Sequence, residues 1–241
     1  MNKKIYLLAV VLFVSFVSLT SCSETEAVDE YANWEARNAE YIDFVASQVT
    51  QDLKVNEAGK IDETLKVGDW RRIKDYRHFS ESGFNGVNDH VYIHVNEVGN
   101  GTITPVYSDS VYVYYRGTLI NDVVFDSSYG TKGAKDEITL FPGKEPSADG
   151  DVYQHIVYVP DTDILTPSKF KLSSLIVGWI TAMQQMHVGD CWTIYIPSNL
   201  GYGTSGSGDI PGNSTLIFDV TLGKILDSAG NVLDSIGTDE E

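Results

Sequence analysis

Cysteine and basic residues are both scarce in this chain of 241 residues. There are two cysteines, Cys22 and Cys191, and once Cys22 is assigned to lipid attachment (below) no internal disulfide can form, so stability must come from the core. Only 17 Lys and Arg stand against 34 Asp and Glu, a net charge of −17. Nucleic acid is excluded as a partner, because phosphate binding needs a basic face. The 42% of apolar residues is enough for a soluble globular core.

The sequence also lacks an apolar run of comfortable membrane-spanning length. Lys3 and Lys4 precede an almost wholly apolar stretch, Ile5 to Leu19, which is short for a span and has the proportions of an export signal. The stretch ends in "LTSC", which resembles the lipobox of bacterial lipoproteins. This resemblance implies that residues 1–21 are a signal peptide and that Cys22 is lipidated, in the cell envelope of a Gram-negative bacterium. Ser23, rather than Asp, favours the outer membrane. An unprocessed membrane anchor is the alternative.

Sites for metals, nucleotides and nucleophiles are missing. Among five histidines, His90 and His94 would lie about 13 Å apart on a strand, too far to share one ion. "GYGTSG" (201–206) matches the dinucleotide fingerprint, but a strand follows it where a helix is required. No serine sits in G-x-S-x-G, and Asp190 beside Cys191 would raise the thiol pKa. We expect no metal and no cofactor.

Helical periodicity is found in two places. Residues 31–53 predict an amphipathic helix that packs on the protein's own domain or, alternatively, mediates dimerisation or partner binding. A shorter helix is expected from Gly178 to Met186, stopped by Gly189, with Val177 and Gly178 turning the backbone close beneath a ligand. The apolar face of the first helix is expected to comprise Trp34, Tyr41, Phe44, Val45 and Val49.

Period-two alternation dominates the rest of the chain and predicts an α+β domain, an antiparallel sheet with a short helix packed on it. Residues 69–79 are interpreted as a small helix or an edge strand with a solvated face. Residues 129–167 contain "HIVYV", which predicts a strand or hairpin, and the acidic tail from Asp227 is expected to be loose. The predicted strands fall within residues 90–95, 110–119, 120–128, 191–197 and 215–225.

Aromatic residues are the remaining candidates for a site. They come from separate segments, and side chains distributed in this way are more often core than pocket, so the residues alone leave both readings open. Five of them stand out: Tyr115, Phe125, Trp179, Tyr202 and Phe218.

From Asn88 to Ile225 the chain resembles the FKBP-type peptidyl-prolyl cis-trans isomerases. The resemblance is carried by "VYVYYRGTL", "FDSS", "FKLSSLIVGWITAMQQMHVGD", "IYIPSNLGYG" and "IPGNSTLIFDVTL", in the family's order. It implies a curved antiparallel sheet around a short helix, with a shallow apolar pocket between them. The implied layout is a tether and helical extension (22–87), an FKBP-like domain (88–226) with an insertion (129–167), and an acidic tail (227–241).

The resemblance also implies the site residues. The Ile176 backbone N–H and the Tyr202 hydroxyl would bond substrate carbonyls, while Asp126 at the rim would orient neighbouring tyrosines. Trp179 would form the floor. The implied catalytic set is Tyr115, Phe125, Asp126, Ile176, Trp179, Tyr202 and Phe218, with Leu175, Ile210 and Phe170 binding substrate.

The implied activity is rotation of X-Pro bonds in exported or envelope polypeptides, which assists their folding as a chaperone does. The insertion departs from the family's short connection and is expected beside the pocket mouth, where it would extend the groove, recruit a partner or cover the site. A weakly catalytic peptide-binding or chaperone lipoprotein on the same scaffold is the alternative. The implied partners are proline-containing polypeptides, a membrane reached through the lipid and, through the first helix, a second copy of the chain.

Overall fold

The computed structural model describes residues 29–49, 51–128, 134–140, 154–160 and 166–236. The elements described here belong to one compact unit that begins at Asn33. The expected signal peptide and the lipidation site Cys22 lie outside the described residues. Within the described ranges, no helix has both the length and the apolar character needed to cross a membrane.

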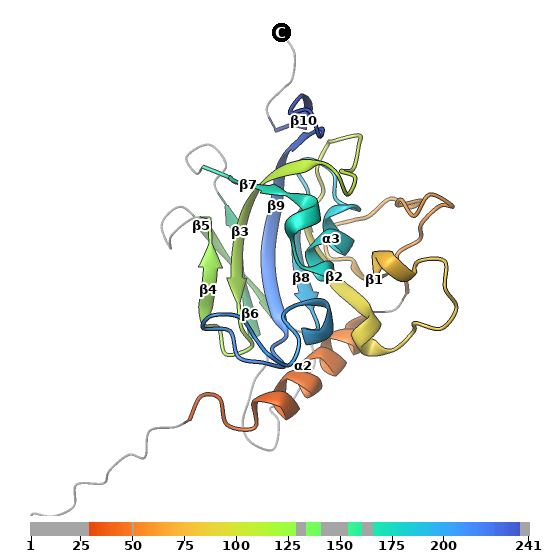
Figure 1. The fold of residues 1–241 in the computed structure, drawn as a ribbon. Coiled ribbons are helices and arrows are strands. Elements are labelled where there is room, and N and C mark those ends of the chain that lie inside the picture. The colour runs from red at the N-terminus through yellow and green to blue at the C-terminus, as the bar shows by residue number, and fades with distance from the viewer. Residues whose placement is uncertain (1–28, 50, 129–133, 141–153, 161–165, 237–241) are drawn as a thin grey trace, which may run out of the picture. The chain divides into compact units, whose positions relative to one another are not determined.

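One antiparallel sheet dominates the described part of the chain (Figure 1). Its main path runs β1-β2-β8-β9-β3-β4, with β10 paired to β9 and β7 paired to β3. The long β9 lies along the whole of β3, from Ser110 opposite Leu226 to Thr118 opposite Ile217. The strands are β1 (Trp70–Lys74), β2 (His90–Glu97), β3 (Ser110–Thr118), β4 (Val124–Ser127), β7 (Ser168–Lys171), β8 (Cys191–Ile196), β9 (Leu216–Leu226) and β10 (Val232–Ser235).

The inner face of the sheet carries the main core. Ile93, Ile194 and Phe218 are neighbours across three strands, and their side chains point to the same face because strand side chains alternate. They are buried in one cluster with Trp179 and Met183 of the short helix. The period-two patterns of the sequence therefore predicted the core face correctly, and the sheet packed around a short helix confirms the α+β class.

The short helix α3 (Val177–Met183) ends earlier than the sequence suggested. The expected end at Met186 is wrong because Gln185 and Met186 close tighter turns, and Gly189 (φ 89°) instead turns the chain toward β8. Gly178 also has another role than expected. A Cβ there would lie 2.3 Å from Ile196 Cγ2, so the glycine lets α3 approach β8.

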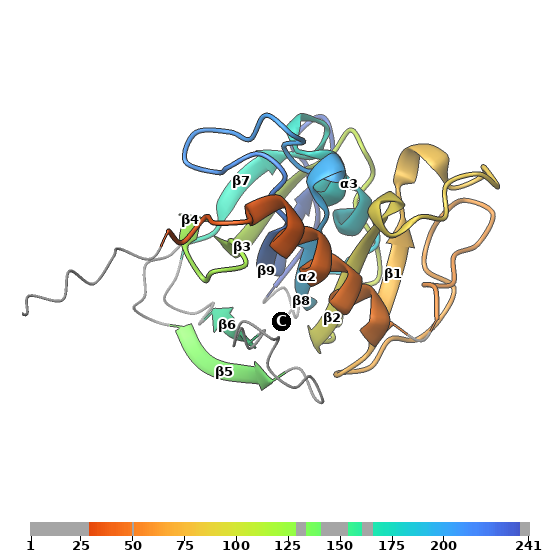
Figure 2. The same cartoon turned by 90° about the horizontal axis from the view of Figure 1, so that it is seen from below.

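The N-terminal helix α2 (Trp34–Gln48) packs on the protein's own sheet, the first of the two alternatives. Its Tyr41 and Ile42 contact the outer-face side chains Tyr92, Tyr195 and Ile217, which alternate with the inner-face set. Figure 2 shows α2 crossing the sheet on the side away from α3. The helix is shorter than the expected residues 31–53. Asn33 is left-handed (φ 52°) and Val49 is extended, so neither can continue it.

The buried face of α2 differs slightly from the expected one. Phe44 and Val49 are only half-buried, whereas the polar Asn38 is 2% exposed and lies within the buried stripe. Periodicity counts apolar residues and therefore misses a buried amide that is satisfied by hydrogen bonds.

Residues 69–79 are not a solvated face. Residues 70–74 form β1, an edge strand paired with β2, and a short 3₁₀ turn, Tyr76–His78, follows. Ile73 and Arg71 are both buried, and Arg71 forms ion pairs with Glu63 and Asp69 that compensate its burial. The basic run is thus an amphipathic strand whose charges are paired locally.

The segments expected as insertion and tail both contribute strands. Residues 129–167 contain a hairpin of β5 (Ala134–Leu140) and β6 (Gln154–Pro160), which confirms the expected hairpin, and β6 contacts β3 and β9. Residues 232–235 of the tail form β10 on β9, so a wholly loose tail is wrong. Backbone pairing with β9 holds this segment, while its apolar residues Val232 and Leu233 remain exposed.

Candidate functional site

A pocket of about 330 Å³ opens between α3 and the inner face of the sheet. Strands β3, β4, β7 and β9, the entry to α3 and the loop 201–215 all contribute side chains. All ten residues that the resemblance implied for the site line this one cavity, together with Ser174: Tyr115, Phe125, Asp126, Phe170, Leu175, Ile176, Trp179, Tyr202, Ile210 and Phe218.

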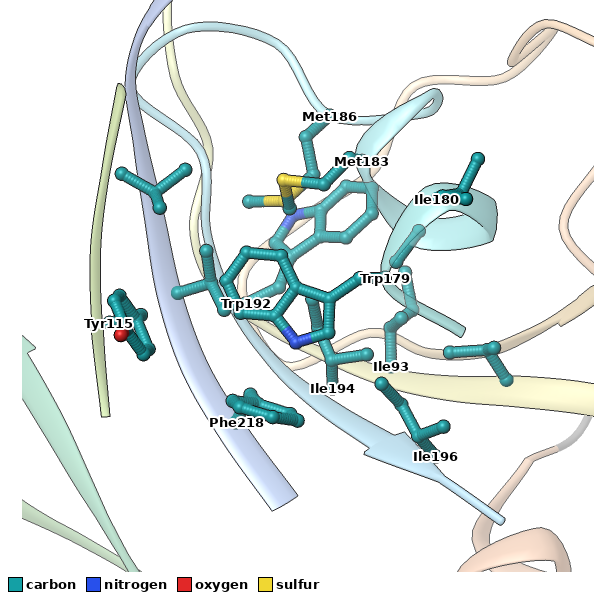
Figure 3. Close-up of a cluster of buried hydrophobic side chains, with 14 of the residues drawn as sticks. Ile93, Tyr115, Trp179, Ile180, Met183, Met186, Trp192, Ile194, Ile196 and Phe218 are labelled. Carbon is teal, nitrogen blue, oxygen red and sulfur yellow. The ribbon is translucent and has the colours of Figure 1, made fainter. Parts of the chain in front are cut away.

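Trp179 lies at the base of the aromatic cluster and is only 4% exposed. Its ring makes edge-to-face contacts with Tyr115 (centroids 5.6 Å apart), Phe218 (5.1 Å) and Phe170 (6.1 Å). Figure 3 shows the indole reaching from α3 toward Tyr115 on β3 and Phe218 on β9. Edge-to-face pairs are the preferred arrangement of aromatic rings, so the floor is held rigidly by its neighbours.

A glycine makes room for the opposite wall. Phe125 and Phe218 meet edge to face with centroids 5.3 Å apart. A Cβ on Gly117 would lie 2.6 Å from the Phe125 ring and 2.8 Å from the Phe218 ring. Only a residue without a side chain lets both rings approach β3, so Gly117 of the "YYRGTL" motif shapes the pocket without lining it.

Hydroxyl groups and one carboxylate form the polar rim. Burial raises the pKa of Tyr115 well above its ordinary value, and the hydrogen bond to Asp126 and the negative charge of that carboxylate raise it further. Burial, followed by the charge of Asp126, raises the pKa of Tyr202, whose side chain is 38% exposed at the mouth. Both phenols are therefore protonated at neutral pH and able to donate hydrogen bonds.

Leu175 and Ile176 bring backbone to the pocket at the entry of α3. Ile176 is extended (ψ 154°), and its carbonyl accepts the first helical bond from Ile180 N–H at 3.1 Å. Amide N–H groups at a helix start have no partner within the helix, so they suit a carbonyl acceptor from outside.

Ser174 is the lining residue that sequence reasoning missed. It is exposed, and its hydroxyl donates to the carbonyl of Lys171 at 2.7 Å. A serine after "F-x-L" carries no distinctive signal, so only the folded backbone reveals its position.

Other chemistry has no support in the described residues. No three His, Cys, Asp or Glu side chains converge there as metal ligands would. Cys191 is buried, and burial raises the pKa of its thiol to about 12, so the thiolate needed for nucleophilic attack is scarce at neutral pH.

The fold and the cavity together define a class: an α+β domain with a pocket lined mainly by aromatic and aliphatic side chains between the sheet and a short helix. Residues 157–223 match the family described as FKBP-type peptidyl-prolyl cis-trans isomerase. The matched stretch contains α3, β8 and most of β9.

The curated relatives include proteins named as peptidyl-prolyl cis-trans isomerases. The chain is 33% identical over 147 residues to the FKBP-type 22 kDa peptidyl-prolyl cis-trans isomerase of Escherichia coli, covering 61% of this chain and 55% of that protein. It is 34% identical over 129 residues to the peptidyl-prolyl cis-trans isomerase Mip of Coxiella burnetii, covering 53% of this chain and 41% of that protein. The chain thus spans about half the length of these relatives.

The crystal structure of FkpA from Escherichia coli aligns with 95% of this chain and 75% of that chain, at a TM-score of 0.47 and 23% identity.

Proposed function

We propose that this protein is a peptidyl-prolyl cis-trans isomerase that acts on X-Pro bonds of exported or envelope polypeptides. The observation that carries the proposal is the open aromatic cavity of about 330 Å³ above Trp179. A pyrrolidine ring with its flanking amide is an apolar group of suitable size for such a cavity.

The chemistry needs no nucleophile and no cofactor. Rotation about the prolyl amide is slow because it breaks amide resonance, with a barrier of about 18–20 kcal/mol. An enzyme has only to bind the twisted amide more tightly than either planar form. The twisted carbonyl has less charge separation than the planar one, so a dry aromatic cavity favours it. Phe125, Trp179 and Phe218 supply that environment.

Polar groups at the rim would hold the peptide while its amide rotates. The Tyr202 hydroxyl and the Ile176 N–H would donate to substrate carbonyls on either side of the ring. Asp126 would act on Tyr115 and Tyr202 rather than on the substrate, since it accepts a hydrogen bond from Tyr115 and its charge lies close to both phenols. Each such hydrogen bond contributes about 0.5–1.5 kcal/mol, so no single polar residue is expected to be indispensable.

A coupled isomerisation assay on the full chain tests the proposal. We expect faster cis-to-trans exchange of a short X-Pro peptide than in buffer, and competition by a second proline peptide. If the chain binds such peptides and suppresses aggregation without accelerating the exchange, it is the weakly catalytic chaperone. If it neither binds nor accelerates, the proposal fails.

The second part of the proposal is a lipid anchor at Cys22, supported by the "LTSC" motif at residues 19–22. Expression in a Gram-negative host should yield a membrane-associated chain whose mass includes acyl groups. Cys22→Ala should release it from the membrane fraction and remove the mass increment. A wild-type chain without acyl groups would contradict the anchor.

A homodimer through α2 stays a prediction. The apolar face of the helix packs on its own sheet, so a dimer would have to use the opposite face, where Glu35, Glu40 and Asp43 are exposed. Three acids repel their copies across a twofold axis, so such a dimer should dissociate at low salt. Light scattering at low and high ionic strength measures this directly.

A further inference from the structure

The loop between β8 and β9 carries two pocket residues but little regular structure. Tyr202 and Ile210 line the cavity, while Gly203, Gly206, Gly208 and Asn213 all have positive φ. Four amides of the loop donate to carbonyls of the same loop: Gly206 to Tyr202, Ser207 to Ile210, Ile210 to Ser207 and Asn213 to Gly203. Each further contact from outside the loop removes alternative conformations and favours the one in which both side chains face the cavity.

Helix α2 contacts the loop where it joins β9. The Trp34 indole N–H donates to the Ser214 hydroxyl at 2.9 Å, and this hydroxyl donates to the Pro211 carbonyl at 2.6 Å. Pro211 directly follows Ile210 of the pocket. One side chain of the N-terminal helix is thus linked through a single hydroxyl to the residue beside the substrate cavity.

Asn38 makes a second attachment one helical turn later. Its side-chain oxygen accepts from the Thr215 amide at 2.7 Å, and its amide group donates to the Trp34 carbonyl at 2.8 Å. Both side chains are buried, Trp34 at 7% and Asn38 at 2% exposure. Buried hydrogen bonds of this kind hold a unique geometry, because the unpaired alternatives are costly.

The two arms of the loop, residues 202–206 and 210–215, also contact each other. The attachment to α2 therefore reaches the arm that carries Tyr202. A Cβ on Gly212 would lie 2.0 Å from the Thr204 carbonyl oxygen, and a Cβ on Gly206 would lie 2.2 Å from that of Ile210. Fixing residues 211–215 therefore restricts the arm that begins at Tyr202.

We propose that Trp34 and Asn38 of the N-terminal helix are positioning residues, which set substrate affinity by fixing the loop 201–215 against the pocket. The inference rests on the proposed isomerase function but concerns residues outside the matched FKBP-type stretch. Neither residue lines the cavity, so each acts through Tyr202 and Ile210.

The test compares variants of the full chain that differ only in this attachment. Trp34→Phe removes the indole donor and keeps a ring, and Asn38→Ala removes the acceptor of the Thr215 amide. Ile42→Val is the control, because Ile42 packs α2 on the sheet in the other buried cluster.

Three quantities are measured: KM and kcat for an X-Pro peptide, hydrogen exchange of the Gly206 and Asn213 amides, and stability to denaturant. Trp34→Phe and Asn38→Ala should raise KM about 2- to 10-fold with a smaller change in kcat, as expected for lost ground-state binding worth one hydrogen bond. Their loop amides should exchange faster. Ile42→Val should keep the wild-type KM and loop exchange, even where it lowers stability.

Two results would overturn the inference. In the first, Trp34→Phe and Asn38→Ala behave as Ile42→Val does in both KM and loop exchange. In the second, the loop amides exchange faster while KM stays at the wild-type value. If the wild-type chain shows no turnover, the proposed function fails. The inference is then tested separately, by comparing loop exchange and peptide affinity between the wild type and the variants.

Discussion

At the residue scale, the pocket depends as much on a missing side chain as on those present. Gly117 lies opposite Phe218 in the β3–β9 register and opposite Asp126 in the β3–β4 register. It therefore stands between the two strands that supply the aromatic wall, and its hydrogen leaves space where a methyl group would collide with both rings.

We expect Gly117→Ala to weaken peptide binding more than its control. The new methyl group must displace the Phe125 or Phe218 ring, and such overpacking costs about 1–3 kcal/mol. Gly223→Ala on β9 is the matched control, since its Cβ would meet Tyr114 at 3.2 Å, a contact that small shifts can relieve. Titration with a proline peptide should show a larger loss of affinity for Gly117→Ala. Equal affinities would contradict a shaping role.

The aromatic wall should matter more than the carboxylate at the rim. Phe125→Ala removes a wall of the apolar cavity and should lower kcat/KM by more than about 10-fold. Asp126→Ala removes a hydrogen-bond partner of Tyr115 and should lower it by about 2- to 10-fold. The isomerisation assay checks both. Wild-type rates in Phe125→Ala would refute this account of the pocket.

At the element scale, the N-terminal extension holds the short helix that carries Trp179. The Lys60 ammonium donates to the carbonyl of Gln184, just beyond the end of α3, at 3.0 Å. It also donates to the carbonyl of Pro105, in the segment between β2 and β3, at 2.9 Å. The Gln185 side chain donates to the Gly59 carbonyl at 2.7 Å. A cation at a helix C-terminus satisfies carbonyls that the helix leaves unpaired.

Lys60→Met should destabilise the protein by about 1–2 kcal/mol, because two carbonyls lose a charged donor. Burial lowers the pKa of Lys60, so part of the favourable interaction is already offset. Lys60→Arg, which retains donors, is the control and should lose less. Urea unfolding at neutral pH gives the stability of both variants. If the urea midpoint of Lys60→Met equals that of the wild type, the Lys60 hydrogen bonds do not stabilise the protein.

At the scale of the whole molecule, stability should depend on pH mainly on the alkaline side. Burial raises the pKa of Cys191 and of Tyr92 to about 12 each, above their ordinary values of 9.0 and 10.0. The folded state therefore keeps protons that the unfolded state releases. This stabilisation is fully present below pH 9 and is lost as the pH rises from 9 toward 12.

Denaturant unfolding between pH 8 and about 11 should show this decline. The free energy of unfolding should fall by up to about 1.4 kcal/mol per pH unit for each retained proton. Tyr92→Phe loses the hydrogen bond to the Val87 carbonyl and should be less stable at pH 8, yet its slope above pH 10 should be shallower. Parallel curves for the two proteins would contradict the assignment to Tyr92.

Local chemistry and periodicity determined the sheet, the short helix and the face that each strand buries, because alternation is a property of the backbone. The pocket residues lie in five separate segments, and their type alone could not distinguish a core from a cavity. The family motifs supplied that distinction, and the ten residues that they implied line one cavity.

What only the tertiary structure decided is where the polar and poorly patterned segments pack. Asn38 is an amide in an apolar stripe and binds Thr215, far along the sequence. Arg71 is a charge in a strand and pairs with Glu63 and Asp69, and residues 232–235 of the tail are held by backbone pairing with β9. Hydrophobic patterning reflects the free energy of transferring a side chain out of water, which depends on the residue type and not on its neighbours in the fold. Hydrogen bonds and ion pairs depend on the partner's position, and this exists only once the chain has folded.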